Sequence, residues 1–508
     1  MPADRRAPIR VARWAAAVAL AVVLGAAVVI AERLQMEFVV LGVAALLLCA
    51  AVISRAPVWA VLLPLLYVDN PIVRYLGISN SSPFGYGPTA ALLLLGLIVA
   101  IGAVAVEGRR PRFRELDALI GVVMAVTVVS AAYGYVRGNP PEYVFSDVAQ
   151  YLEFGIFYAI ARVLIEGRTQ ALYVVGLIAI VATLAAATDL LQLVTGRISL
   201  GPLGTAASRP DQLINPLAAL QIPALLTYLI HNPRRHRFWI MGALTICTAS
   251  MLLGFTRGLW LGVAGAVIFL TLTLDRAGLR FRPIVLTLGG VAGTLALASL
   301  PALLSDGAPD VLGLALSRAQ YTSQQLLDPV NEIQMRRIIE VDTVVQSLPT
   351  VPILGLGLGA TYVGPTGASL ADLVIGPRHY IHDAYAALLF RMGVLGLLCT
   401  AWLSIRYLWL SVRAYRRETD TVVRAILLGL PASYVATAIF SVTTDSLFRD
   451  PIGMFTGLAL ALTVSLARQP GTHGEEGEAQ AVTPTAAPPT RTLARHPFHQ
   501  ETRRGSQT

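Results

Sequence analysis

An all-helical membrane protein that crosses the bilayer many times is the fold class that this sequence predicts. Three observations predict it. Of the 508 residues, 55% are hydrophobic and 14% are charged. The mean hydropathy of +0.66 is far above that of chains that stay soluble as globules. Apolar runs long enough to span the hydrocarbon core follow one another along most of the chain.

The first element is the N-terminal stretch "RRAPIRVARWAAAVALAVVLGAAVVIAERL". It has a basic start and then a run of roughly 18 apolar residues, which is enough for one span. No small-residue cleavage site follows before the next span. We therefore expect a retained first helix, preceded by a cytoplasmic N-terminus of residues 1–14.

Thirteen further apolar segments follow the first. The third candidate is the weakest, because it contains Pro64, Asp69, Asn70 and Arg74. Boundaries read from apolar runs are accurate to a few residues. The candidate spans are 11–31, 36–54, 57–76, 88–106, 116–136, 144–165, 171–194, 215–231, 238–255, 258–274, 283–304, 383–405, 421–441 and 450–467.

Four arginine clusters set the expected orientation, because cytoplasmic loops carry an excess of positive charge. With the N-terminus inside, alternating spans place "EGRRPRFRE", "HNPRRHR", "DRAGLRFR" and "RYLWLSVRAYRRE" on the cytoplasmic side. Leaving out one span would move later clusters outside, whereas leaving out two neighbouring spans would not. The pattern predicts an even number of spans, 12 to 14, with both termini on the cytoplasmic side.

The domain organisation follows from this topology. Residues 15–304 form a first transmembrane block, and 383–467 form the last transmembrane helices. The extracytoplasmic loop between them, 305–382, is too long for a simple connection and is expected to contain short helices. One is "NEIQMRRIIEVDTVVQSL", which precedes the glycine-rich "PILGLGLGATYVGPTG". Residues 468–508 lack periodicity and are expected to be a disordered cytoplasmic tail.

Several arginines fall on the outer side, where the positive-inside pattern does not account for them. Guanidinium groups bind phosphate through two parallel hydrogen bonds, so a diphosphate at the membrane surface would gain most from two or three of them. Alternatively, Arg257 is a snorkelling residue at a helix end, and Arg336 and Arg337 lie on the solvated face of a helix. The candidates are Arg257 in "GFTRGLWLGV", Arg318, Arg336 and Arg337 in the loop, and Arg378.

His379 and His382 are the two histidines, of seven, that face outward in this topology. Each could act in chemistry or merely form a structural hydrogen bond. With Asp372 and Asp383 as scattered neighbours the ligand set is too thin for zinc, so no metal and no other cofactor is expected. The three cysteines lie in apolar segments and predict neither disulfides nor a metal site. The net charge of +9 resides in short clusters between spans, which argues against nucleic acid as a partner.

His382 and Asp383 stand where the span 383–405 begins. The N-terminus of a helix presents free N–H groups and a positive dipole end, which attract anions and favour a neutral imidazole. A base beside a bound diphosphate is the arrangement expected in a transferase. The imidazole takes a proton from an acceptor hydroxyl, while arginines stabilise the departing diphosphate.

Three stretches resemble the O-antigen ligase and polymerase family of bacterial membrane glycosyltransferases, which are GT-C-like. "FTRGLWLGVAG" is similar to the family's Ser-Arg-Gly-x-Trp element. "RRIIEVDTVVQSLPTVPILGLGLGATY" is similar to its Arg-led helix and Pro-x-x-Gly-x-Gly-x-Gly turn. "IHDAYAALLFRMGVLGLL" is similar to its His-Asn signature, which ends in Gly-x-x-Gly at the start of a helix. The likeness covers about residues 170 to 465.

The resemblance implies transfer of an undecaprenyl-diphosphate-linked glycan to a glycan or lipid acceptor at the outer face of the cytoplasmic membrane, without a metal. It implies His382 as the base and Arg257 and Arg337, or Arg336 instead of Arg337, as diphosphate ligands; Arg378 is added from its proximity and His379 is a secondary candidate. The resemblance leaves polymerase and ligase open.

Two residues depart from the family pattern. Asp383 stands where the family usually has Asn, and Arg391 stands where an acidic or polar residue is common. Asp383 could orient His382 and raise its basicity, or could itself be the base.

A transporter or lipid-linked glycan flippase with an arginine-lined cavity is the alternative function. It predicts functional charges midway through spans and internal repeats. The sequence shows no convincing repeat, and its unexplained charge gathers at one face. A purely structural scaffold would leave the outer arginines and histidines unexplained. Charged residues do occur within the expected spans, at Asp147, Glu153, Arg162 and Asp189.

Overall fold

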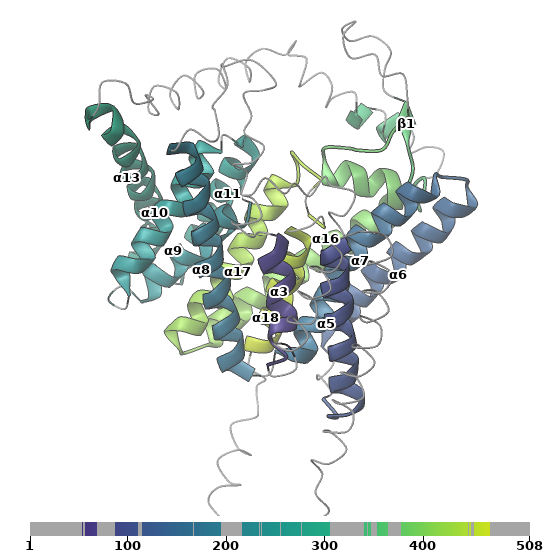
Figure 1. Cartoon of the computed structure of the whole chain (residues 1–508), viewed down its shortest axis with the longest axis horizontal. Helices are drawn as coiled ribbons and strands as arrows, with labels where there is room; N and C mark the ends of the chain where they lie inside the picture. Colours follow the sequence, from purple (N-terminus) through teal and green to yellow (C-terminus); the bar gives the residue numbers. More distant parts are fainter. Residues whose placement is uncertain are drawn as a thin grey trace, which may run out of the picture. The chain divides into compact units, whose positions relative to one another are not determined.

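The part of the chain that the structure describes is all-helical apart from one short strand pairing (Figure 1). The structure is a computed structural model. It describes residues 53, 56–68, 87–109, 114–165, 167–194, 216–232, 234, 236–254, 256–275, 277–304, 340–342, 344–346, 353–363, 377–445, 447–448 and 452–467. All of these belong to one compact unit, which ends at Ala467. The tail expected at 468–508 lies outside the described residues.

The helices of the described part follow the apolar segments of the sequence. They are α3 (Trp59–Val68), α5 (Gly87–Ala105), α6 (Glu115–Val136), α7 (Pro141–Leu164), α8 (Gly167–Val194), α9 (Pro216–His231), α10 (Arg237–Leu253), α11 (Arg257–Thr273), α12 (Ala277–Arg280), α13 (Arg282–Leu304), α16 (Ala384–Arg417), α17 (Thr421–Phe440) and α18 (Ile452–Leu466).

The all-helical expectation is confirmed, and the apolar helices support a membrane protein. The segments expected at 11–31 and 36–54 fall outside the described residues, except for Ile53. Four of the described helices are long and apolar enough to cross a membrane: Glu115–Val136, Gly167–Leu191, Ala384–Arg417 and Thr421–Phe440. The number of membrane spans, 12 to 14, therefore stays a prediction, as does the orientation of the chain in the membrane.

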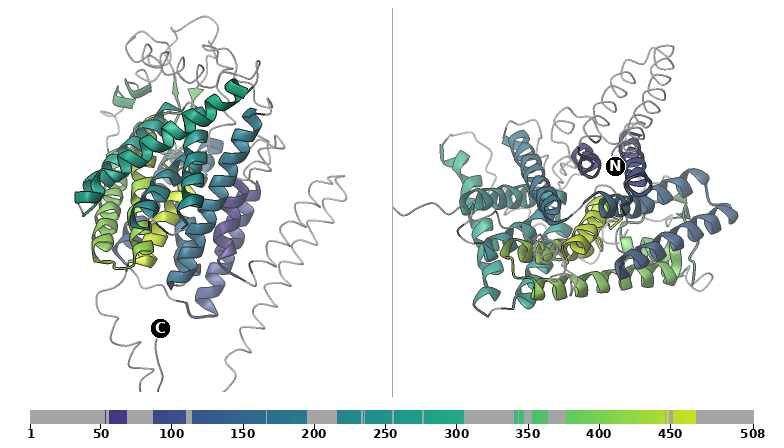
Figure 2. Two further views of the ribbon diagram at one scale, coloured as in Figure 1. Left: turned by 90° about the vertical axis from the view of Figure 1, so that its left-hand side faces the viewer. Right: turned by 90° about the horizontal axis from the view of Figure 1, so that it is seen from below.

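Helix α17 forms the centre of the bundle, with α9 and α11 against it and α16 and α18 beside it (Figure 2). Small residues allow the closest of these approaches. A Cβ on Gly262 of α11 would lie 2.5 Å from the carbonyl oxygen of Ala436 in α17. Close helix contacts through small residues are typical of membrane bundles. On the opposite side of the bundle, α6 packs against α7 and α16, and α18 packs against α7.

Large apolar side chains cover the outward faces of several helices. Leu94 of α5 is 59% exposed, Val128 of α6 is 54% exposed and Leu398 of α16 is 61% exposed. Large apolar side chains exposed in this number are unfavourable in water and favourable against lipid. The exposed faces therefore agree with a bilayer around the bundle.

A break within α16 receives the glycine-rich turn that precedes it in the chain. Gly393 has φ 66° and ψ −166°, which interrupts the helix after its first ten residues. The interruption frees backbone groups that need new partners. The Phe390 carbonyl accepts from Leu356 N–H at 2.8 Å, and Leu395 N–H donates to the Ile353 carbonyl at 3.2 Å. The turn thus supplies partners for two backbone groups of α16 beside the break.

The turn needs glycine because three of its residues lie in the left-handed region. Gly355, Gly357 and Gly359 have φ values of 65°, 85° and 79°. A Cβ at Gly355 would lie 2.6 Å from the backbone nitrogen of Gly393, and a Cβ at Gly357 would lie 2.3 Å from the Cα of Gly134 in α6. A side chain at either position would separate the turn from the helices. The Gly-x-Gly-x-Gly pattern is therefore a packing element.

The chain then returns to α16 through a two-residue antiparallel pairing. Strand β1 (Tyr362–Val363) pairs with β2 (Pro377–Arg378), with Tyr362 opposite Arg378. This pairing brings the end of the glycine turn beside the residues that precede α16. Of the helix expected at 331–348, the structure describes residues 340–342 and 344–346, and these are helical.

Candidate active site

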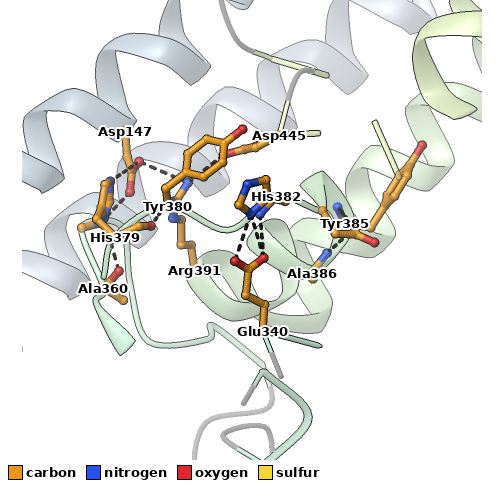
Figure 3. A network of polar contacts seen from close by, with 12 residues as sticks. Asp147, Glu340, Ala360, His379, Tyr380, His382, Tyr385, Ala386, Arg391 and Asp445 are labelled. Atoms are coloured by element: carbon orange, nitrogen blue, oxygen red, sulfur yellow. Dashed lines mark hydrogen bonds and ion pairs between the residues drawn. The ribbon is translucent and has the colours of Figure 1, made fainter. Parts of the chain in front are cut away.

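His382 stands one residue before the cap of α16, and the carboxylate of Glu340, which precedes the glycine-rich turn in the chain, holds one edge of its ring (Figure 3). His382 Nδ1 lies 2.9 Å from Oε1 and 3.1 Å from Oε2 of Glu340. The Glu340 side chain is 7% exposed, whereas the His382 side chain is 47% exposed. With Nδ1–H donating to the carboxylate, Nε2 is the ring nitrogen able to accept a proton.

The electrostatics of Glu340 favour its charged form. Burial alone would raise the pKa of the Glu340 carboxyl, but hydrogen bonds from His382 and Tyr362 hold the pKa below its usual value. The Tyr362 hydroxyl donates to Oε1 of Glu340 at 3.3 Å. Glu340 is therefore a carboxylate at neutral pH, suited to orient an imidazole.

The backbone around His382 is held at successive peptide groups. Such anchoring fixes a side chain in position before any ligand arrives. The anchors are Arg391 Nη2 to the His379 carbonyl (2.7 Å), the Tyr362 hydroxyl to the Tyr380 carbonyl (3.1 Å), His382 N–H to Glu340 Oε2 (3.1 Å) and Ala384 N–H to the Ser441 carbonyl (2.9 Å).

Asp383 caps α16. Its Oδ1 accepts from the backbone N–H groups of Tyr385 at 2.8 Å and Ala386 at 3.0 Å. This contact uses the first amides of the helix, which the sequence had suggested were free to attract an anion. It also differs from the orienting role considered for Asp383, because the carboxylate that holds the His382 ring is Glu340.

A buried ion network lies next to the His382 segment. Arg391, fully buried in α16, places Nη1 3.2 Å from Asp147 Oδ1 and 3.4 Å from Asp445 Oδ2. Asp147 Oδ2 also accepts from Gly359 N–H at 2.8 Å. Arg391 stands at a position where the family resemblance implies an acidic or polar side chain. Its positive charge is balanced here by the carboxylates of Asp147 and Asp445. Buried charges of opposite sign satisfy each other in this way.

His379 belongs to this network. Its Nε2 lies 3.0 Å from Asp147 Oδ1, and its ring stacks on Tyr143 with centroids 4.4 Å apart. The side chain is 14% exposed, far less than that of His382. Of the two outward histidines in the sequence analysis, His379 has a structural partner on α7, and His382 presents a ring edge to the surface.

The start of α11 lies near the start of α16 because both meet the end of α17. A Cβ at Gly258 would lie 2.0 Å from Thr443 Oγ1, and the neighbouring Ser441 carbonyl accepts from Ala384 N–H. Arg257 is the first residue of α11 and Arg378 the second residue of β2, so the backbone of both is described, but their side chains are not. Arg318, Arg336 and Arg337 lie outside the described residues.

Several site residues were not proposed from the sequence. Glu340 lies three residues after Arg337 and four after Arg336, a spacing that puts residues on one face of a helix, and this was the available signal. Asp445 carried no signal, because it follows α17 in an irregular segment. The charges noted within spans have varied roles: Arg162 pairs with Asp117 at 3.2 Å, and Glu153 and Asp189 are buried.

Among the residues that the structure describes, no group of three or more His, Cys, Asp or Glu side chains could hold a metal ion. No protein-family model matches the chain, and no curated protein matches it either. Functional assignment therefore rests on the motifs and on the geometry around His382.

Proposed function

We propose that the protein is a membrane glycosyltransferase of the O-antigen ligase or polymerase type, with His382 as its base. The observation that supports this most is the pair of His382 and Glu340, with Nδ1 on the carboxylate and the ring 47% exposed. A carboxylate that orients an imidazole while leaving Nε2 accessible is the arrangement used to accept protons from hydroxyl groups.

The proposed reaction joins an acceptor hydroxyl to the anomeric carbon of a glycan carried on undecaprenyl diphosphate. Nε2 of His382 takes the hydroxyl proton as the new carbon–oxygen bond forms. The bond between the anomeric carbon and the diphosphate oxygen breaks, and its electron pair leaves with the diphosphate. Arg257, Arg337 or Arg336, and Arg378 are the proposed ligands of the diphosphate, since guanidinium groups match phosphate oxygens in pairs. No metal and no cofactor is required.

The proposed setting is the cytoplasmic membrane of a bacterium, with 12 to 14 spans, both termini inside and His382 at the outer face. The arginine clusters of the sequence support this orientation. The meeting of the starts of α11 and α16 at the end of α17 supports a shared site for Arg257 and His382.

The decisive experiment measures glycan transfer in membranes from an undecaprenyl-diphosphate-linked donor. His382→Ala should lower transfer by at least about a hundredfold, because general-base catalysis contributes on that order. Arg257→Lys should rescue only part of the loss in Arg257→Ala. Undiminished transfer by His382→Ala would rule out the mechanism. In cells lacking the protein, loss of high-molecular-weight glycan means a polymerase, and accumulation of long lipid-linked chains means a ligase.

A lipid-linked glycan flippase or transporter is the second candidate function. The buried Arg391, Asp147 and Asp445 network favours it, because charges inside a helix bundle often line transport routes. Reconstituted vesicles without an acceptor separate the two functions. Translocation of the lipid-linked glycan under these conditions supports the flippase, since transfer chemistry needs an acceptor and flipping does not.

A further inference from the structure

We propose that α16 carries a binding site for an anionic phospholipid at the end opposite His382, formed by Arg406, Trp409 and Arg413. The proposal is independent of the transferase reaction. It rests on the length of α16, on the two stripes of side chains that this helix presents and on the stacking of arginines against tryptophans.

Length places the two ends of α16 at opposite sides of a bilayer. The helix runs from Ala384 to Arg417 over 34 residues. After the break at Gly393 the helix continues to Arg417, and at a rise of about 1.5 Å per residue Trp409 lies about 24 Å beyond the break, which is most of the roughly 30 Å thickness of a hydrocarbon core. Trp402 and Trp409 are therefore positioned as interface anchors at the side opposite His382.

The part of α16 that follows the break at Gly393 buries one stripe of side chains and exposes another. The buried stripe consists of Thr400, Leu403, Tyr407, Ser411 and Tyr415. The exposed stripe carries Leu398 (61%), Trp402 (53%), Ile405 (58%) and Trp409 (45%), and the exposed Arg413 continues it at the next helical turn. Aliphatic and aromatic side chains alternate along the exposed stripe, which ends with Trp409 and the cationic Arg413. An aromatic and then a cationic side chain at the end of an apolar stripe match the interface and the headgroups of a leaflet.

Two guanidinium groups flank Trp409. The Cζ of Arg406 lies 4.5 Å from the Trp409 ring centroid and 6.0 Å from that of Trp402, and the Cζ of Arg413 lies 5.0 Å from Trp409. Stacking holds each guanidinium in a fixed orientation while leaving its N–H groups able to donate. The resulting pair is a cradle for phosphate oxygens beside an apolar surface.

Charge favours an anionic over a zwitterionic lipid. Arg406 pairs with the Glu115 carboxylate, whereas no carboxylate partner of Arg413 occurs within the described part of the chain. A net positive charge therefore remains at Arg413. It lies in the cluster "RYLWLSVRAYRRE", which the sequence places on the cytoplasmic side, where membrane surfaces are anionic.

The test is a titration of the purified full-length protein in detergent with phosphatidylglycerol or phosphatidylcholine, with bound lipids counted by native mass spectrometry. Phosphatidylglycerol should bind about fivefold more tightly or better, as expected for one arginine at a membrane surface. Arg413→Gln should remove most of this preference, and Arg413→Lys should retain most of it. Excess glycerol phosphate should not displace the lipid, because the soluble headgroup lacks the acyl chains that contact Trp402 and Ile405.

Arg417→Gln is the matched control, because Arg417 is exposed on the same helix and no ring contact is recorded for it among the described residues. Equal losses in Arg413→Gln and Arg417→Gln would overturn the proposal in favour of a general basic surface. Equal affinity of the unmodified protein for the two lipids would also overturn it. As a second measurement in bilayers, brominated phosphatidylglycerol should quench tryptophan fluorescence more than brominated phosphatidylcholine, and Arg413→Gln should remove the difference.

Discussion

Arg391 of α16 and Asp147 of α7 form an ion pair in which both side chains are fully buried, with Nη1 and Oδ1 3.2 Å apart. The same guanidinium donates through Nη2 to the His379 carbonyl, three residues before His382. One buried side chain thus joins two helices and fixes the segment that presents the proposed base. Because Arg391 is paired with buried aspartates, the effect of its substitution on stability can be predicted.

Arg391→Gln should lower the free energy of unfolding by about 3–5 kcal/mol, because it leaves two buried aspartates without their cation. Adding Asp147→Asn should cost much less than the sum of the single variants. Thermal unfolding in detergent measures both effects. Additive losses would show that Arg391 and Asp147 do not depend on each other.

Glu340→Gln should reduce glycan transfer by at least about tenfold while the protein folds normally, because the amide orients the His382 ring without the charge of a carboxylate. Glu340→Asp, which keeps the charge on a shorter side chain, should recover part of the rate. Asp342→Asn is a matched control, since Asp342 occupies the same helical segment and bonds to Gln346. Comparable losses in Asp342→Asn and Glu340→Gln would contradict an orienting role.

Glu340 also predicts a pH dependence of stability. Its pKa is lowered in the folded protein, so the stability that it contributes is present above its unfolded value, near 4.5, and is lost as the pH falls through the folded value. The difference in melting temperature between the unmodified protein and Glu340→Gln should therefore be constant near neutral pH and shrink below about pH 4.5. A difference that grows on acidification would contradict this sign.

Asp383→Asn should keep both stability and transfer near those of the unmodified protein, because asparagine caps helices as well as aspartate does. Asp383→Ala should lower stability by about 1 kcal/mol through loss of the bonds to Tyr385 and Ala386. Transfer rates of Asp383→Asn decide whether this carboxylate acts as a base. A loss as large as that of His382→Ala would assign the base to Asp383.

Gly355→Ala should destabilise the protein by more than about 1 kcal/mol, because it combines a positive φ with a clash against the backbone of α16. Gly121→Ala in α6 is the matched control, since no atom lies within 4 Å of the added Cβ, and it should be neutral or slightly stabilising. Unfolding midpoints in detergent compare the two. Equal midpoints would show that the turn adjusts to a side chain at residue 355.

The helices could be predicted because burial in lipid or in a helix bundle requires long apolar runs, and these are visible along the chain. The segment 421–441 and helix α17, for example, agree to within one residue. The apolar runs did not reveal the full length of every helix. Helix α16 continues to Arg417, well past the apolar run, because Tyr407, Ser411 and Tyr415 stay buried on one face.

Individual residues of the site were predictable only where the sequence itself marked them. His382 was marked by standing at the start of an apolar run. Its partner Glu340 lies 42 residues earlier, and contacts across that distance depend on the folded arrangement. Arg391 was visible as a departure from the family pattern, but its two aspartates come from α7 and from the segment after α17. Their pairing became evident only in the folded structure.

The pairing of Arg391 with Asp147 has a consequence for the biogenesis of the protein. Helix α7 is synthesised long before α16, so the nascent protein contains Asp147 before its partner Arg391 has been made. A chain truncated before α16 would therefore contain the Asp147 carboxylate without the guanidinium that pairs with it in the folded protein.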